Sequence, residues 1–365
     1  MDLQGQNGLL TTWREGWRAR GWIAYVVAAL LTAFYLDLYF TEHLTPVARA
    51  LQLPSKWMLY GALYCVAMIG GAAYYLRRHG NSRYNQVRIA VNVGIQVALA
   101  FLLPLIMPWF GGNEFYFSYL WPLDWYKLQP GTLAGLPVYL ALFSIVGSLI
   151  VAPLLAYRYG KRWYCSWVCG CGGLANTFGD PWRHLTSKST QAWRFEKVAV
   201  HTVMFLAIAS TALLALDYVI AGQHGTFHWI VAGEQVWSVK KLYGLVIGSI
   251  LAGVVGVGLY PLFGPRVWCR NFCPMAAMLG LFQKLGRFRI RVKEDMCISC
   301  GNCSTYCEMG IDVRSYAQSN QSFTRAACVG CGMCAHVCPR GVLKLENVAP
   351  LQADKERVRL PVVDL

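Results

Sequence analysis

Long apolar stretches separated by short polar segments occupy residues 1–263 of this 365-residue chain. A helix that crosses a hydrocarbon core about 30 Å thick needs about 20 residues. Six stretches reach that length, namely residues 22–40, 57–76, 89–110, 136–157, 198–220 and 242–263. The pattern therefore predicts an all-α polytopic membrane protein over residues 1–263, with six transmembrane helices in contact with membrane lipid.

The pattern changes twice after residue 263. Residues 264–293 are basic and amphipathic, and we interpret them as a juxtamembrane segment that contains a second C-x3-C motif. Residues 294–347 are rich in Cys and Gly and contain no long apolar stretch, which predicts a small separate domain. Residues 348–365 follow as a C-terminal tail.

The composition agrees with a membrane protein, since 56% of the residues are hydrophobic, 14% are charged and the mean hydropathy is +0.38. The net charge of +15 follows the spans rather than a soluble basic module, so we expect no nucleic-acid partner. The N-terminal arm and the loops after spans two and four hold 14 Lys and Arg residues, and the other three loops hold five. Because basic loops stay in the cytoplasm, we expect both termini inside, in a bacterial cytoplasmic (inner) membrane.

Eight of the 14 cysteines form two C-x2-C-x2-C-x3-C runs in residues 294–347. This is the spacing of bacterial two-cluster 4Fe-4S ferredoxins, in which the fourth cysteine of each run binds the other cluster. It is not a zinc-finger spacing, so we expect an α+β ferredoxin domain on the reducing, cytoplasmic side. Glu308 stands where the first run usually has a proline, but it removes no ligand. The predicted ligands are Cys297, Cys300, Cys303 and Cys338 for one cluster, and Cys328, Cys331, Cys334 and Cys307 for the other.

Two cysteine pairs with C-x3-C spacing follow the fourth and sixth spans: Cys165 with Cys169, and Cys269 with Cys273. Similar segments precede both pairs, so spans three to six are expected to be two copies of one helical hairpin whose ends lie side by side. Residues at i and i+4 share one face of a helix. The two pairs are therefore candidate ligands of a third iron-sulfur or metal centre, with Arg162 and Arg266 offsetting the thiolate charge. Free thiols or redox-active dithiols are the alternative.

The segments CSWVCGCGG and CRNFCPM, together with the runs CISCGNCSTYC and CVGCGMCAHVCPRGV, resemble the membrane-bound polyferredoxin family. This family includes 4Fe-4S membrane proteins of the nitrous-oxide-respiration regulator type and of the periplasmic nitrate reductase quinol dehydrogenase type. The resemblance covers roughly residues 89–347 and departs at Gly170, where members usually have a proline. It implies electron relay between a quinone pool or a cytoplasmic donor and a partner redox protein or flavoprotein subunit.

Three functions stay open at this point. The chain is expected to be an electron-transfer subunit, such as a quinol dehydrogenase component of a respiratory chain. The alternatives are an assembly factor that reduces copper for a membrane oxidase, and a redox-sensing regulator. The sequence contains no dinucleotide-binding or P-loop motif, and no residue is identified as catalytic. We favour electron transfer, because clusters pass single electrons while the helices hold them at the membrane.

Overall fold

The computed structural model describes residues 9–53, 55–107, 115–221, 228–232 and 235–348. Residues 108–110 of the third predicted span and nearly all of the tail, residues 349–365, lie outside this part. Within the described residues, six helical segments are long and apolar enough to cross a membrane: Trp22–Phe40, Lys56–His79, Arg83–Ile106, Val138–Tyr159, Thr190–Ile220 and Lys241–Gly258. Each overlaps one predicted stretch, so the prediction of six long apolar helices is confirmed.

The first three long segments come from the N-terminal half. They are formed by α1 (Leu9–Phe40), α3 (Lys56–His79) and a continuous run of α4 (Arg83–Ile95), the π-helix η2 (Gln96–Leu102) and α5 (Leu103–Ile106). The short helix α2 (Leu44–Ala50) connects α1 to α3, and η4 (Trp125–Leu128) and α6 (Pro130–Ala134) precede the fourth segment.

The other three long segments alternate with the C-x3-C motifs. The fourth consists of α7 (Val138–Val146), η5 (Gly147–Val151) and α8 (Ala152–Tyr159), the fifth of α11 (Thr190–Ala221), and the sixth of α12 (Val239–Tyr243) with η8 (Gly244–Gly258). Helices α9 (Arg162–Cys165), α10 (Gly170–Asn176) and η6 (Asp180–Leu185) lie between α8 and α11. Helices α13 (Tyr260–Phe263), η9 (Trp268–Phe272) and α14 (Pro274–Leu285) follow η8.

The small C-terminal domain is built on two antiparallel strands, β3 (Phe288–Val292) and β4 (Leu343–Asn347). Their register pairs Phe288 with Asn347 and Val292 with Leu343. Helices α15 (Asn302–Thr305), α16 (Val313–Gln318) and α17 (Met333–His336) lie between the strands in sequence. This part therefore has the α+β composition that the sequence predicts.

A second antiparallel pair, β1 (His228–Ala232) with β2 (Gln235–Ser238), follows the fifth long segment. The prediction that residues 1–263 are all helical is wrong here. The physical reason is local, because both strands are rich in Trp, Val and Ile, which favour extended backbone.

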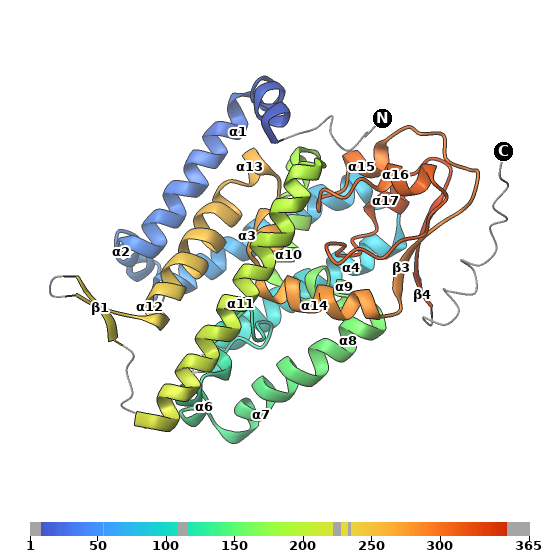
Figure 1. Cartoon of the computed structure of the whole chain (residues 1–365). Helices are drawn as coiled ribbons and strands as arrows, with labels where there is room; N and C mark the ends of the chain where they lie inside the picture. The colour runs from blue at the N-terminus through green and yellow to red at the C-terminus, as the bar shows by residue number, and fades with distance from the viewer. Residues whose placement is uncertain (1–8, 54, 108–114, 222–227, 233–234, 349–365) are drawn as a thin grey trace.

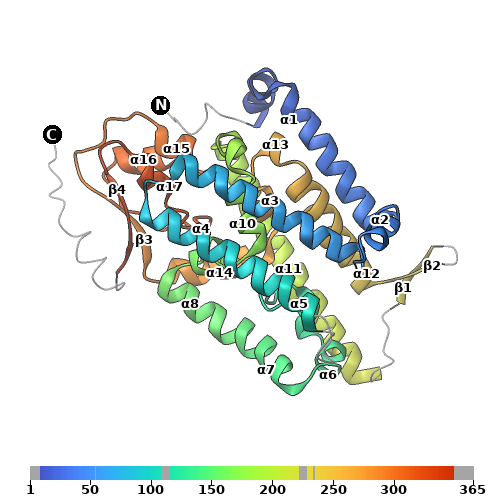
Figure 2. The same ribbon diagram turned by 180° about the vertical axis from the view of Figure 1, so that it is seen from behind.

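The C-terminal domain lies at one end of the helical bundle (Figures 1 and 2). It lies beside α8 and the adjoining ends of α3 and α4, whereas α2, α6 and β1 lie at the opposite end. Contacts fix this placement, since Tyr84 Oη donates to the Gly330 carbonyl at 2.8 Å and the Arg287 amide donates to the Tyr157 carbonyl at 2.9 Å. The loops after spans two and four thus lie on the same side as the cysteine runs.

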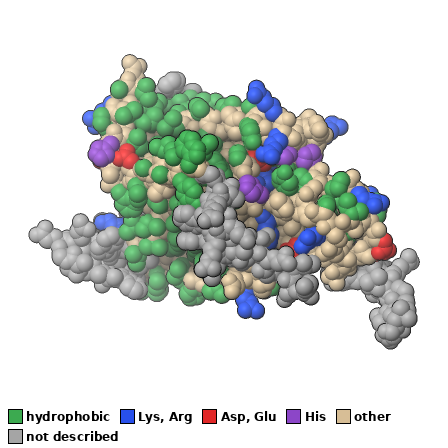
Figure 3. Space-filling view, turned by 90° about the horizontal axis from the view of Figure 1, so that it is seen from above, with side chains coloured by type: hydrophobic (Ala, Val, Ile, Leu, Met, Phe, Trp, Pro, Cys, Tyr) green, Lys and Arg blue, Asp and Glu red, His purple; other side chains and the backbone are tan. Residues whose placement is uncertain are grey.

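Apolar side chains cover much of the outside of the bundle (Figure 3). Large ones are exposed along several long segments, among them Leu30, Val66, Leu154 and Phe205. An exposed apolar surface of this extent is costly in water and favourable against lipid. The helical part is therefore suited to a membrane.

Candidate iron-sulfur centres

Four cysteines line a cavity at the surface of the C-terminal domain: Cys297, Cys300, Cys303 and Cys338. We call them the first cysteine group. Three come from the first run and one from the second, as the sequence predicts for one cluster. Cys300 is exposed and the neighbouring Ile298 is 52% exposed, so this group lies close to solvent. Arg314 and Arg340 also line the cavity and give its rim a positive charge.

The remaining four ferredoxin cysteines line a second cavity: Cys307, Cys328, Cys331 and Cys334. They form the second cysteine group, again with three members from one run and one from the other. Buried Glu308, Met309 and Val329 line the same cavity, which therefore lies deeper than the first. Gly301 and Gly332 have φ angles of 81° and 80° immediately before α15 and α17, a conformation that costs glycine little.

The fourth cysteine of each run has the same local geometry. The Ile311 amide donates to Cys307 Sγ, and the Val342 amide donates to Cys338 Sγ, both at 3.4 Å. Backbone N–H groups aimed at sulfur stabilise thiolate ligands and tune a bound cluster. Four sulfurs around one cavity, with amide donors behind them, fit a 4Fe-4S cluster.

A single metal ion fits less well. Four thiolates on one Zn²⁺ would lie about 3.8 Å apart, given tetrahedral geometry and a Zn–S distance of about 2.3 Å. Among the described residues, no three His, Cys, Asp or Glu side chains are placed to hold one ion. A cubane spreads its ligands over four corners and therefore takes a wider spacing of the sulfurs than one ion does.

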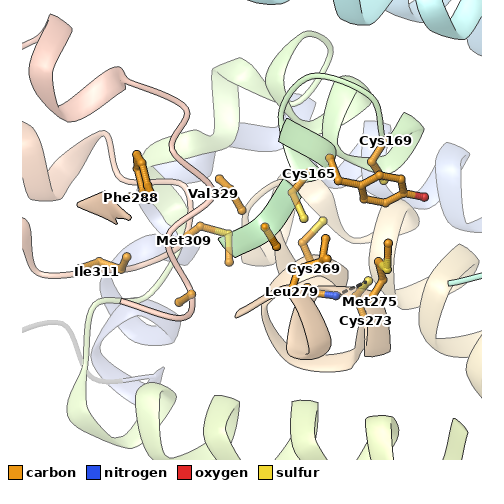
Figure 4. Packing of buried hydrophobic residues seen from close by; sticks show 14 of the residues in the cluster. Cys165, Cys169, Cys269, Cys273, Met275, Leu279, Phe288, Met309, Ile311 and Val329 are labelled. Carbon is orange, nitrogen blue, oxygen red and sulfur yellow. Dashed lines mark hydrogen bonds between the residues drawn. The ribbon is translucent and has the colours of Figure 1, made fainter. Parts of the chain in front are cut away.

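The two C-x3-C pairs form a third cysteine group inside the molecule: Cys165, Cys169, Cys269 and Cys273. All four are buried in one cluster of side chains, and Figure 4 shows the two pairs facing each other. Burial raises the pKa of Cys165 and of Cys269 to about 11. Burial also raises the pKa of Cys273, and negative charge on Cys269, Cys165 and Cys169 raises it further.

The prediction that each pair shares one helical face is wrong. Helix α9 ends at Cys165, and Cys169 has extended backbone (φ −66°, ψ 132°) as the residue before α10. In the second pair, Cys273 is likewise extended (φ −85°, ψ 111°) before α14. The two motifs thus share a turn-to-helix geometry, which agrees with the internal repeat. A turn over residues 166–168 connects the cysteines of the first pair, whereas the π-helix η9 leads from Cys269 to Cys273 in the second.

Only one of the two predicted arginines lies at the third cysteine group. Arg266 is fully buried and donates from Nη1 to Cys269 Sγ at 3.6 Å and to the Cys165 carbonyl at 3.2 Å. Arg162 instead donates to the Tyr159 carbonyl and stacks on Phe288. The prediction for Arg162 is therefore wrong. Buried Lys161 supplies the second positive charge and counteracts the pKa rise of Cys165.

The long helices hold the first C-x3-C turn through polar side chains. Gln96 Nε2 donates to the Val168 carbonyl at 2.5 Å, Asn92 Nδ2 to the Cys169 carbonyl at 3.4 Å, and Tyr64 Oη to the Gly170 carbonyl at 3.0 Å. Gly170 makes this possible, because a Cβ there would lie 2.6 Å from Gln96 Oε1 and 2.8 Å from Tyr64 Oη. A proline would clash, which explains the departure at this position.

The second and third cysteine groups are directly connected. Ser166, within the first C-x3-C motif, donates from Oγ to the carbonyl of Val329, within the second run, at 2.7 Å. Gln283 of α14 donates to the Cys328 carbonyl at 2.9 Å and accepts from the Lys161 amide at 2.7 Å. The sequence gives no signal for these contacts, because they join segments that lie 45 to 163 residues apart.

The structure explains Glu308, which stands where the first cysteine run usually has a proline. Its carboxylate is fully buried between Arg183 and Arg266. Burial alone would raise its pKa, but the two guanidinium groups outweigh burial and hold the pKa below its usual value. The position usually occupied by proline thus carries a buried negative charge beside Cys307.

Comparisons with known proteins agree with these groups. A family model for a 4Fe-4S dicluster domain matches residues 290–345, and a model for a 4Fe-4S binding domain matches residues 140–188 and 246–293. The second model covers both C-x3-C pairs. No solved structure matches the chain.

Three curated relatives align with part of the chain. YccM of Escherichia coli (strain K12), named as a candidate electron transport protein, is 28% identical over 53% of this chain and 52% of its own length. MauN of Methylobacillus flagellatus, named as a methylamine utilization ferredoxin-type protein, is 26% identical over 46% and 55%. The uncharacterized protein MJ0749 of Methanocaldococcus jannaschii is 24% identical over 45% and 58%.

The chain therefore spans little more than half the length of these relatives. The chain thus contains 4Fe-4S domains in both its helical and its C-terminal part, and it is similar to relatives named for electron transport and as a ferredoxin-type protein.

Proposed function

We propose that the chain is a membrane-anchored electron relay that holds one 4Fe-4S cluster on each of its three cysteine groups. The observation that carries the proposal is their arrangement in series. The second group shares both cysteine runs with the first, and it contacts the third through Ser166 and Val329. Bound 4Fe-4S clusters accept and donate single electrons. The protein supplies their spacing, their burial and the donors to their sulfurs.

The series has one end in solvent and one end among the helices. At the solvent end, exposed Cys300 and the basic Arg314 and Arg340 suit contact with an acidic, soluble redox protein. At the other end, Gln96 and Tyr64 of the long helices hold the turn of the third group. A quinone in the bilayer or a partner subunit, including a flavoprotein, is the proposed second partner.

The proposed location is a bacterial cytoplasmic membrane, with the ferredoxin domain in the cytoplasm. The basic loops after spans two and four lie beside the C-terminal domain, and basic loops are retained in the cytoplasm. A reducing compartment also keeps thiols available as ligands.

The number of clusters is the first test. Protein purified without oxygen should contain about 12 iron and about 12 sulfide per chain, four of each per cluster. Replacing Cys165 and Cys269 together by Ala should reduce both counts to about eight. The matched control is Cys65→Ala, because Cys65 is buried in α3 and has no place in any cysteine group. About eight iron atoms in the unchanged protein would contradict the third cluster.

Reduction kinetics test the partners. The relay should be reduced by menaquinol or by a reduced ferredoxin, and the Cys165→Ala, Cys269→Ala double variant separates the two ends. It should lose reduction by the quinol and keep reduction by the soluble donor, because only the quinol reaches the relay through the third group. Equal loss of both reactions would contradict this order.

A further inference from the structure

A buried ion-pair network joins the second and third cysteine groups. Glu308 directly follows Cys307, and each of its carboxylate oxygens faces one arginine. Arg183 Nη1 lies 2.9 Å from Oε2, and Arg266 Nη2 lies 2.9 Å from Oε1. The three side chains are at most 1% exposed, so water screens these charges little.

Each arginine also reaches a cysteine sulfur of a different group. Arg183 Nη1 donates to Cys331 Sγ at 3.9 Å, and Arg266 Nη1 donates to Cys269 Sγ at 3.6 Å. A guanidinium group presents five N–H donors in a fixed plane, so it can serve a carboxylate and a sulfur at once. One carboxylate thereby touches both cysteine groups through two arginines.

The rest of the network holds Arg183 independently of Glu308. Asp180 Oδ1 lies 3.0 Å from Arg183 Nε, and His79 Nε2 lies 3.4 Å from the other Asp180 oxygen. Fully buried Arg88 adds a further positive charge close to Glu308. Removing only the charge of Glu308 should therefore change the local field more than the positions of these side chains.

We infer that Glu308 sets the reduction potentials of the second and third centres together, because its buried negative charge lies between two arginines that each donate to a sulfur of one centre. The inference rests on the proposed function, since it requires a cluster on both groups. A cluster's potential depends on nearby charge and on hydrogen bonds to its sulfurs. The carboxylate lowers both potentials through its charge, and each arginine raises one potential through its N–H donor.

The test is a redox titration followed by electron paramagnetic resonance, with signals assigned from cysteine variants. Glu308→Gln keeps the shape of the side chain and removes its charge. The midpoint potentials of the second and third centres should both rise, while the first centre and the iron count stay unchanged. Glu294→Gln is the matched control, because Glu294 is an exposed carboxylate of the same domain, and it should move neither potential.

Two lysine variants give an independent readout. Arg183→Lys keeps the charge but loses the planar donor set, so it should lower the potential of the second centre alone. Arg266→Lys should lower that of the third centre alone. A Glu308→Gln variant that shifts one potential or none, or lysine variants that shift both equally, would overturn the inference. If Glu308→Gln loses iron, the Arg183→Lys and Arg266→Lys variants test the inference instead, through their separate shifts of the second and third potentials.

The iron count separates failure of this inference from failure of the proposed function. About 12 iron atoms with unshifted potentials would overturn the inference alone. About eight iron atoms in the unchanged protein would overturn the three-cluster function, and the inference with it.

Discussion

At the scale of single residues, burial controls the chemistry of the cysteines in the third group. Burial raises the pKa of Cys165, Cys269 and Cys273 above the usual thiol value, which favours the protonated form near neutral pH. Disulfide exchange requires a thiolate, so burial of this kind opposes it. When a cluster binds, iron replaces the protons on the cysteine sulfurs, so the raised pKa values no longer keep the sulfurs protonated.

The exchange of fourth ligands between the two ferredoxin runs is a testable property of individual cysteines. Cys303→Ala and Cys338→Ala should each remove the spectrum of the first centre, because both side chains line the first cavity. Cys307→Ala should remove the same signal as Cys331→Ala, since both line the second cavity. Resonance spectra in which Cys303→Ala and Cys307→Ala remove the same signal would contradict the exchange.

Asp124 should make stability depend on pH. Burial raises its pKa to about 6, against about 4 when unfolded, although Lys127 3.5 Å away opposes the rise. The folded protein thus binds this proton more tightly, and stability should increase by about 2–3 kcal/mol as the pH falls from above 6 towards 4. Thermal unfolding in detergent between pH 4 and 7 measures the effect.

Asp124→Asn should flatten the pH dependence of stability in that range, because the amide does not titrate. The exposed Glu294→Gln should keep the dependence of the unchanged protein. Parallel curves for Asp124→Asn and the unchanged protein would show that another group is responsible.

At the scale of elements, a turn that leads from a cysteine into a helix is the repeated unit of the third centre. In both copies the second cysteine is extended and the next helix begins directly after it, at Gly170 in α10 and at Pro274 in α14. The glycine copy packs against the polar side chains of Tyr64 in α3 and Gln96 in η2.

Gly170→Ala should therefore destabilise the first turn. The added Cβ would meet Gln96 and Tyr64 oxygens that already bind this turn, and overpacking of this kind costs about 1–3 kcal/mol. The expected result is a lower unfolding temperature and faster loss of about one third of the iron. Gly94→Ala is the control, because a Cβ at Gly94 would meet no atom within 4 Å. Equal behaviour of the two variants would contradict the crowding at Gly170.

At the scale of the whole molecule, the ferredoxin domain and the basic loops share one end of the bundle, whereas α6 lies at the other. Reporter fusions test the membrane topology that follows. Fusions after Ser82 and after Leu365 should report the cytoplasm, and a fusion after Gly135 should report the outside, because an odd number of spans precedes it. A cytoplasmic Gly135 fusion or an external Leu365 fusion would overturn the orientation.

The sequence by itself determined the parts of this protein that depend on local pattern. Six long apolar helices follow from length and hydropathy, and the two ferredoxin runs follow from a spacing of two and three residues that few other sites use. The sequence also predicted that the two C-x3-C motifs lie side by side, because each follows one copy of a repeated helical hairpin. The hairpin β1–β2 was missed, since a short strand signal is weak beside long apolar helices.

Only the tertiary structure decided how the three cysteine groups are joined. Arg183 belongs to no motif, and Glu308 was visible only as a departure from one. Their ion pair links positions 125 residues apart in the sequence, Arg183 before α11 and Glu308 in the ferredoxin run. Local pattern cannot specify such a contact, because it depends on how separate elements pack. The sequence therefore determined which residues can hold clusters, and the packing decided which charges lie between them.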